Sequence, residues 1–110
     1  LRQAPLYFHR WDGNERVGRE LFSDFAHSEP LHQFNTAEFP TLDLRAELRA
    51  ITAPTLVVAG DDDMIAGPVC AEAIVRELHD GRLVTIPGTG HFLYVEQPEA
   101  FRAALTGFLL

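Results

Sequence analysis

The chain has 110 residues, of which 46% are hydrophobic and 23% charged, an ordinary balance for one small globular domain with a buried core. The formal net charge is −7 and the nine basic residues, all arginine, are scattered, so we expect no nucleic-acid-binding surface. No stretch approaches the ~20 consecutive apolar residues that span a bilayer, and no secretory signal opens the sequence. We therefore expect a soluble, cytoplasmic protein without a membrane partner.

Cysteine content and the first residue give two further expectations. Cys70 is the single cysteine, which excludes an internal disulfide and a thiolate metal cluster and fits a reducing compartment. Free cysteine usually behaves as a small buried apolar residue, so we expect Cys70 to be buried on a helix. The sequence starts at Leu1 rather than at a methionine, which indicates a processed product, a cleaved piece or the edge of a longer chain.

Residues 1–41 contain no strand-like run and are rich in aromatic side chains. Apolar residues recur at helical spacing within them, which predicts an amphipathic helix over 14–26. Pro30 and Pro40 bracket the segment that follows. The residues of the apolar stripe are Val17, Leu21, Phe22 and Phe25.

From Leu42 onward the pattern becomes regular. A short helix is expected over 43–49, and the continuous apolar run 55–59, ending at Gly60, predicts a strand buried on both faces. Proline is favoured in the first turn of a helix, so Pro68 predicts the start of the next one, which Asp80 and Gly81 end. The expected apolar stripe of that helix is Cys70, Ala71, Ile74, Val75 and Leu78.

Residues 83–86 predict a second strand, 87–90 a loop, and Pro98 the start of a last helix. A helical crossover between two buried strands favours parallel pairing with a right-handed connection. Two strands leave both outer edges unpaired, so we expect further strands from another chain or a longer parent. The expected apolar stripe of the last helix is Phe101, Leu105, Phe108 and Leu109.

The two loops that follow the strands carry the candidate chemistry. Ligands of open α/β sheets bind beyond the carboxyl ends of the strands. Asp63 lies in the first loop and His91 in the second. A buried carboxylate on one imidazole nitrogen fixes the tautomer, while the other nitrogen takes a proton from a nucleophile. The two serines, Ser23 and Ser28, lack the flanking glycines of a strained nucleophile turn, so the sequence predicts an acid and a base without a nucleophile.

Two runs of the sequence carry a family resemblance: 51–63, ITAPTLVVAGDDD, and 90–101, GHFLYVEQPEAF. Over about residues 42–110 the chain closely resembles the C-terminal part of α/β-hydrolase-fold enzymes. The resemblance implies an acid three positions after Gly60, which is Asp63, and a base at His91. It also implies the chain order nucleophile, acid, histidine, of which this sequence holds the last two.

The acid loop departs from the family pattern in one place. The family often has a proline seven positions after the glycine, where this chain has Gly67 and then Pro68. A one-residue shift in the loop would make Asp62 the acid, although we favour Asp63.

The resemblance implies that residues 1–41 are a helical cap segment and 42–110 the C-terminal part of the hydrolase core. The stretch YFHRWDG at 7–13 faintly resembles the capped branch related to proline iminopeptidases. Met64, Ile65 and Phe92 flank the acid and base, and we predict that they line the substrate pocket.

Other polar residues favour plainer interpretations. The aspartate triplet lacks the oxygen ligand and the glycine that a calcium loop requires at Ile65 and Ala66, so we expect no metal. Glu96 and Glu99 are interpreted as helix-start charges favoured by the helix dipole. Three histidines fit no metal template and are expected at the surface or lining a pocket: His9, His27 and His32.

The leading hypothesis is a fragment or subunit of a serine-type hydrolase that cleaves an ester or amide without a cofactor. Asp63 would orient His91, which would act on a nucleophile supplied by an N-terminal companion chain or segment. The alternative is a non-catalytic relative that binds a ligand or serves assembly. The upstream sequence would discriminate between them, since Gly-x-Ser-x-Gly after a strand supports catalysis. An aspartate nucleophile, as in dehalogenase-like relatives, stays open.

Overall fold

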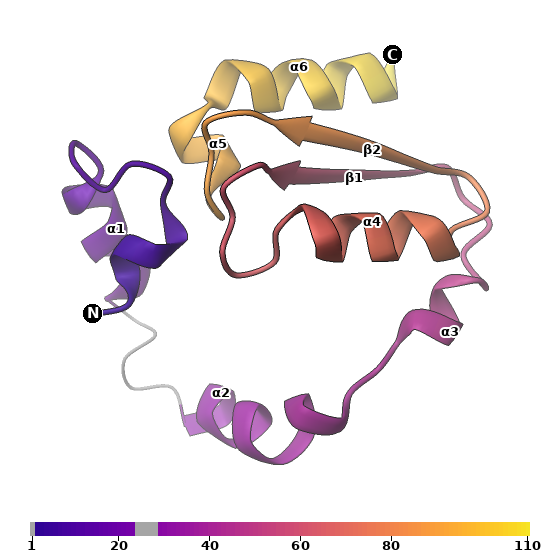
Figure 1. Ribbon diagram of the computed structural model, residues 1–110, viewed down its shortest axis with the longest axis horizontal. Coiled ribbons are helices and arrows are strands. Elements are labelled where there is room, and N and C mark those ends of the chain that lie inside the picture. Colours follow the sequence, from indigo (N-terminus) through magenta and orange to yellow (C-terminus); the bar gives the residue numbers. More distant parts are fainter. Residues whose placement is uncertain (1, 24–28) are drawn as a thin grey trace.

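A parallel pair of strands between two helices organises the computed structural model, which describes residues 2–23 and 29–110 (Figure 1). Strands β1 (Thr55–Gly60) and β2 (Gly81–Ile86) run parallel, with Thr55 opposite Gly81 and Gly60 opposite Ile86. Helix α4 (Pro68–Glu77) packs on one face of the pair and α6 (Pro98–Leu109) on the other. The chain thus forms an α/β/α arrangement, with parallel pairing as the helical crossover predicts.

The N-terminal elements lie beside the end of the sheet at which both strands terminate (Figure 1). They are the 3-10 helix η1 (Ala4–Tyr7) and helix α1 (Glu15–Phe22). The short helix α5 (Leu93–Glu96) follows β2 at the same end.

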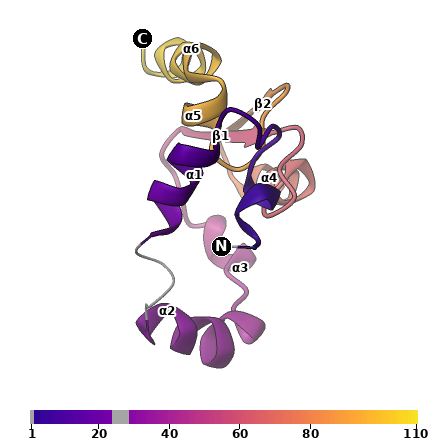
Figure 2. The same ribbon diagram turned by 90° about the vertical axis from the view of Figure 1, so that its left-hand side faces the viewer.

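The segment between the N-terminal elements and the sheet stands apart from the strands in both views (Figures 1 and 2). It carries exposed apolar side chains, among them Phe39 at 62% and Leu44 at 55% exposure. The elements are α2 (Glu29–Gln33), the π-helical η3 (Phe34–Glu38), the 3-10 helix η4 (Phe39–Thr41) and α3 (Arg45–Leu48).

The local sequence explains where the central elements begin. Pro68 is the first residue of α4, after the extended cap residue Gly67, and Pro98 is the first residue of α6. Gly88 has φ +67°, a left-handed conformation that glycine adopts without a steric penalty, in the turn after β2.

Several boundaries differ from the predictions by a few residues. Strand β2 starts at Gly81 rather than at 83, and the helix expected over 43–49 covers Arg45–Leu48. The helix predicted over 14–26 is α1 from Glu15 to Phe22, and positions 24–26 lie outside the described residues. Helix α5 is not among the predicted elements; residues 1–41 are predicted to be helical in character, but of their helices only α1 is predicted by position.

Some burial predictions were wrong. Cys70 is exposed, whereas Ala71 of α4 and Leu78, the residue that follows the helix, are the buried ones. In β1 only Ala59 and Gly60 are buried, because no further strand covers the edges of the pair within 2–23 and 29–110. On the helices, Ile74 (37%), Leu105 (37%) and Leu109 (73%) are exposed.

No helix in the described ranges is both long and apolar enough to cross a bilayer. The division of the chain into a cap segment and a core part at residues 41 and 42 stays a prediction.

Candidate active site

Asp63 and His91 meet at the carboxyl end of the parallel strands. Each follows its strand by a few residues, and Asp63 Oδ2 lies 3.0 Å from His91 Nδ1. The Asp63 side chain is 5% exposed and that of His91 is 35% exposed, so the carboxylate is covered while the imidazole remains accessible. This is the juxtaposition that an acid–histidine pair requires.

The Asp63 carboxylate is held by the turn that follows it. Its Oδ1 accepts hydrogen bonds from the backbone N–H groups of Ile65 (2.8 Å) and Ala66 (3.1 Å). Burial alone would raise the pKa of Asp63, but these two bonds and the one from His91 together hold that pKa below its usual value. An ionised Asp63 makes His91 Nδ1 the donor, which leaves Nε2 free to accept a proton.

The neighbouring aspartates have other partners. Asp62 Oδ2 lies 2.8 Å from His9 Nδ1. Asp61 Oδ1 accepts from the backbone N–H groups of Gly88 (2.9 Å) and Thr89 (3.4 Å). Of the two acids that the sequence leaves open, Asp63 is therefore the one in contact with His91.

The two loops also bond to each other through their backbones. Asp61 N donates to Ile86 O (3.1 Å) and Asp62 N to Thr89 O (3.0 Å). A Cβ at Gly60 would collide with the carbonyl oxygens of Thr89 and Gly90, so only glycine permits this approach. The loop contacts therefore set the distance between the acid and the imidazole.

Two rings of an aromatic cluster, those of Tyr7 and Phe92, contact the histidine. The Phe92 ring packs against Phe8 (5.2 Å between centroids), Tyr7 (5.8 Å) and Phe22 (5.9 Å). The Tyr7 ring meets the His91 imidazole edge-on, at 5.4 Å and 81°. Apolar side chains around an imidazole limit its motion and the access of water.

The predicted pocket-lining residues lie in different surroundings. Phe92 is half-buried in the aromatic cluster, whereas Met64 is 74% and Ile65 44% exposed. Their role in substrate binding stays a prediction. Next to the aromatic cluster a recess of about 380 Å³ is lined by Arg2, Gln3, Ala4, Tyr7 and Phe22.

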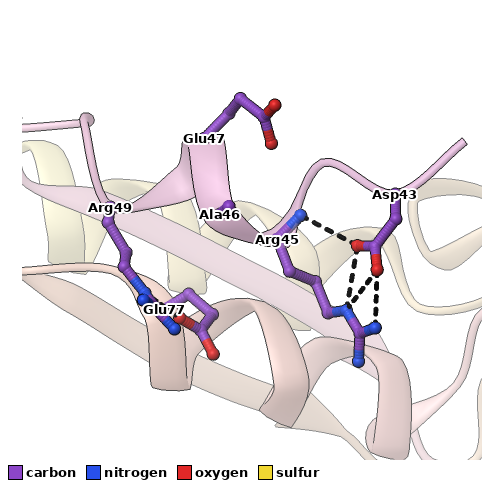
Figure 3. A pocket seen from close by; sticks show the side chains of 6 residues that line it. All are labelled: Asp43, Arg45, Ala46, Glu47, Arg49 and Glu77. Carbon is purple, nitrogen blue, oxygen red and sulfur yellow. Dashed lines mark hydrogen bonds and ion pairs between the residues drawn. The ribbon is translucent and has the colours of Figure 1, made fainter.

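A second recess, of about 430 Å³, lies between α3 and α4 at the opposite end of the strands (Figures 1 and 3). Its arginines are already paired: Arg45 with Asp43 at 2.6 Å and Arg49 with Glu77 at 2.6 Å. The hydrogen bonds from Arg45 lower the pKa of Asp43 to about 2. No histidine is among the described residues that line this recess, so it is not the candidate site.

No metal site accompanies the pair in the part of the chain that the structure describes, and the serine of that part bonds within its own segment. No three His, Cys, Asp or Glu side chains there could hold an ion. Ser23 Oγ donates to the Glu20 carbonyl (2.8 Å), while Ser28 and His27 lie outside the described residues.

Comparison with known proteins identifies the family of the chain. A sequence model described as the Alpha/beta hydrolase family matches residues 1–104. The chain belongs to the alpha/beta hydrolase family. Its parallel strands and flanking helices are a C-terminal portion of that fold.

Two relatives are hydrolases by name. A putative carbamate hydrolase, RutD, of Variovorax paradoxus is 34% identical over 97 residues, which are 86% of this chain and 36% of the relative. A proline iminopeptidase, PfmaB, of Pestalotiopsis fici is 29% identical over 97 residues, 88% of this chain and 34% of the relative. The hydrolase-family chain thus spans about a third of the length of these relatives.

A solved esterase from Exiguobacterium antarcticum superposes with a TM-score of 0.80 over 96% of this chain and 39% of the esterase. At 21% identity this likeness concerns the fold alone.

Sequence reasoning missed three contributors to the site of this hydrolase-family chain. Glu96 was interpreted as a helix-start charge, yet it binds backbone N–H groups of His9, Arg10 and Gly90. Tyr7 and His9 belong to the predicted cap segment, where His9 is expected at the surface or lining a pocket, and the structure shows their specific partners to be the histidine loop and Asp62. Apart from the bond between Glu96 and Gly90, which spans six positions, these contacts join residues 53 to 87 positions apart, where no local pattern reveals them.

Proposed function

We propose that this chain supplies the acid and the histidine of a serine-type hydrolase that cleaves an ester or an amide. The nucleophile would come from an upstream segment or a companion chain. The observation that carries the proposal is the 3.0 Å contact between the shielded Asp63 carboxylate and the accessible His91 imidazole. Names of the relatives, a carbamate hydrolase and an iminopeptidase, support carbonyl substrates of this class.

The proposed reaction has two halves that use His91 in the same way. Nε2 takes the proton of the serine hydroxyl as its oxygen attacks the substrate carbonyl, and the imidazolium then protonates the leaving oxygen or nitrogen. In the second half, His91 Nε2 takes a proton from a water molecule as the water oxygen attacks the acyl-enzyme. The imidazolium then returns the proton to the serine oxygen, which releases the carboxylic acid and the free serine. Throughout, ionised Asp63 orients the ring and stabilises its charged form.

The test uses the assembled enzyme, meaning this chain together with the segment or chain that supplies the nucleophile. Turnover of aryl esters and of N-terminal amino-acid amides is measured for the wild type and for His91→Ala. We expect kcat to fall by about 10⁴-fold or more, because removing one member of such a unit disables it. Undiminished turnover in His91→Ala would overturn the proposal.

Matched aspartate variants test the assignment of the acid. Asp63→Asn removes the carboxylate that contacts His91, and we expect kcat to fall by about 10⁴-fold. Asp62→Asn makes the same chemical change one position away, where the partner is His9, and we expect less than about a tenfold effect. A reversed order of the two variants would transfer the role to Asp62.

A further inference from the structure

The carboxylate of Glu96 joins the histidine loop to the N-terminal segment. Glu96 Oε2 accepts hydrogen bonds from the backbone N–H of Gly90 (2.7 Å) and of His9 (3.0 Å). Its Oε1 accepts a third from the N–H of Arg10 (2.8 Å). Hydrogen bonds to an ionised acceptor are roughly twice as strong as neutral ones, so one side chain holds the loop and the N-terminal segment together.

The segment that Glu96 holds lies directly against the backbone of His91. The N–H of His91 donates to the carbonyl of Tyr7 at 2.7 Å. A Cβ placed on Gly90 would lie 2.6 Å from Tyr7 O, 2.7 Å from His9 N and 2.8 Å from the carbonyl carbon of Phe8. Contact this close means that the loop backbone cannot shift without moving residues 7–9 as well.

The same segment delivers an aromatic ring to the imidazole. Tyr7 presents its ring to His91 at 5.4 Å and 81°, and Asp63 contacts Nδ1 of the same imidazole. Tyr7 is two residues from His9, whose N–H is bound by Glu96. The His91 ring is therefore oriented by Asp63 through one nitrogen and by Tyr7 through a packing contact that depends on Glu96.

We propose that Glu96 is a positioning residue for His91, acting through the Gly90 backbone and through the segment from Tyr7 to Arg10. This inference rests on the proposed function, because it matters for turnover only if His91 is the base. Misplacing a catalytic group by about 1 Å can cost about 100-fold in rate, so a residue outside the reacting atoms is able to control kcat.

Glu99 provides a matched control for Glu96. It lies three positions further on, is 84% exposed and bonds only Arg102 within the described ranges. Glu96→Gln and Glu99→Gln remove the same charge with little change in size. In Glu96→Gln the amide NH₂ replaces one acceptor oxygen, so at least one backbone N–H loses its partner.

The first readout is steady-state kinetics of the assembled enzyme on an aryl ester. We expect Glu96→Gln to lower kcat by about 10-fold and Glu96→Ala by up to about 100-fold, with KM little changed. Glu96→Asp, which retains the charge, should restore part of kcat. Glu99→Gln should match the wild type.

The second readout is the proton NMR signal of His91 Nδ1–H, which reports the bond to Asp63 without requiring turnover. We expect this signal to broaden or disappear in Glu96→Gln and to persist in Glu99→Gln. If Glu96→Gln lowers only the melting temperature and leaves both kcat and the signal as in Glu99→Gln, the positioning role is wrong. If Glu96→Gln does not fold, the same two measurements are made on Glu96→Asp, and values of kcat and of the Nδ1–H signal equal to those of Glu99→Gln then contradict the positioning role.

The two proposals fail in different ways. Full activity in His91→Ala overturns the proposed function, whereas the Nδ1–H signal still tells whether Glu96 orients the ring. If His91→Ala loses activity as expected but the Glu96 variants keep wild-type kinetics and the wild-type Nδ1–H signal, only the positioning role is overturned.

Discussion

Three consecutive aspartates at the end of β1 perform three different tasks. Asp61 binds the backbone of the histidine loop, Asp62 binds His9, and Asp63 binds His91. Only Asp63 is well shielded from water, at 5% side-chain exposure, against 57% for Asp62. Chemically identical residues thus acquire different functions from the partners that the fold brings to each.

The lowered pKa of Asp63 predicts a dependence of stability on acidity. A carboxylate whose pKa is lower in the folded than in the unfolded state stabilises the fold above its unfolded pKa, and this contribution is lost as pH falls through the folded value. We expect the free energy of unfolding of the assembled enzyme to decrease from about pH 5 downward. In Asp63→Asn part of that decrease should be absent.

Urea unfolding at several pH values between about pH 5 and pH 2 measures the free energy of unfolding against pH for the wild type and for Asp63→Asn. Parallel curves for the wild type and Asp63→Asn would show that Asp63 does not contribute, and Asp62→Asn serves as the control of equal charge.

At the scale of elements, the site is built by loops that approach one another at glycines. Gly60 and Gly90 lie where backbones of different segments touch, so neither position has room for a side chain. Gly107, on α6, has nothing within 4 Å of an added Cβ. The first two glycines serve close packing, whereas the third has no such role.

Gly90→Ala and Gly107→Ala form a matched pair of stability variants. We expect Gly90→Ala to lower the free energy of unfolding by about 1–3 kcal/mol, because its Cβ meets backbone atoms that cannot yield. Gly107→Ala should raise that free energy by about 0.5–1 kcal/mol, because alanine is the better residue inside a helix. Urea unfolding of the assembled enzyme checks both, and shifts of equal sign would contradict the explanation.

At the scale of the whole molecule, few of the apolar side chains in the described part of the chain are buried. The radius of gyration is 15.5 Å, against about 13 Å for a compact domain of 100 residues. Both strands have an outer edge without a partner strand in the described part of the chain. The buried apolar residues of that part are Ala4, Phe8, Ala59, Ala71, Leu78 and Ile86.

We therefore expect the 110-residue chain, expressed by itself, to be insoluble or partly disordered. A two-stranded sheet is marginal on its own, and exposed edges and apolar helix faces favour aggregation. Thermal unfolding followed by circular dichroism tests this expectation. A sharp, cooperative transition of the isolated monomer would contradict it.

Much of the architecture follows from local patterns. The apolar runs predicted both strands, Pro68 and Pro98 predicted the starts of α4 and α6, and the helical crossover predicted the parallel pairing. These features depend on residues close together in sequence, and strand-end loops of parallel neighbours necessarily share one edge. For this reason the strand-end loops predict that an acid of the first loop and His91 of the second lie close together, with Asp62 and Asp63 both left open as the acid.

Tertiary structure alone decided the remaining features. It paired Asp63 rather than Asp62 with His91, exposed Cys70, and made Glu96 a link between loops instead of a helix-start charge. Each outcome depends on contacts across tens of residues and on which helix face meets the sheet, and periodicity and spacing in the sequence do not encode either quantity.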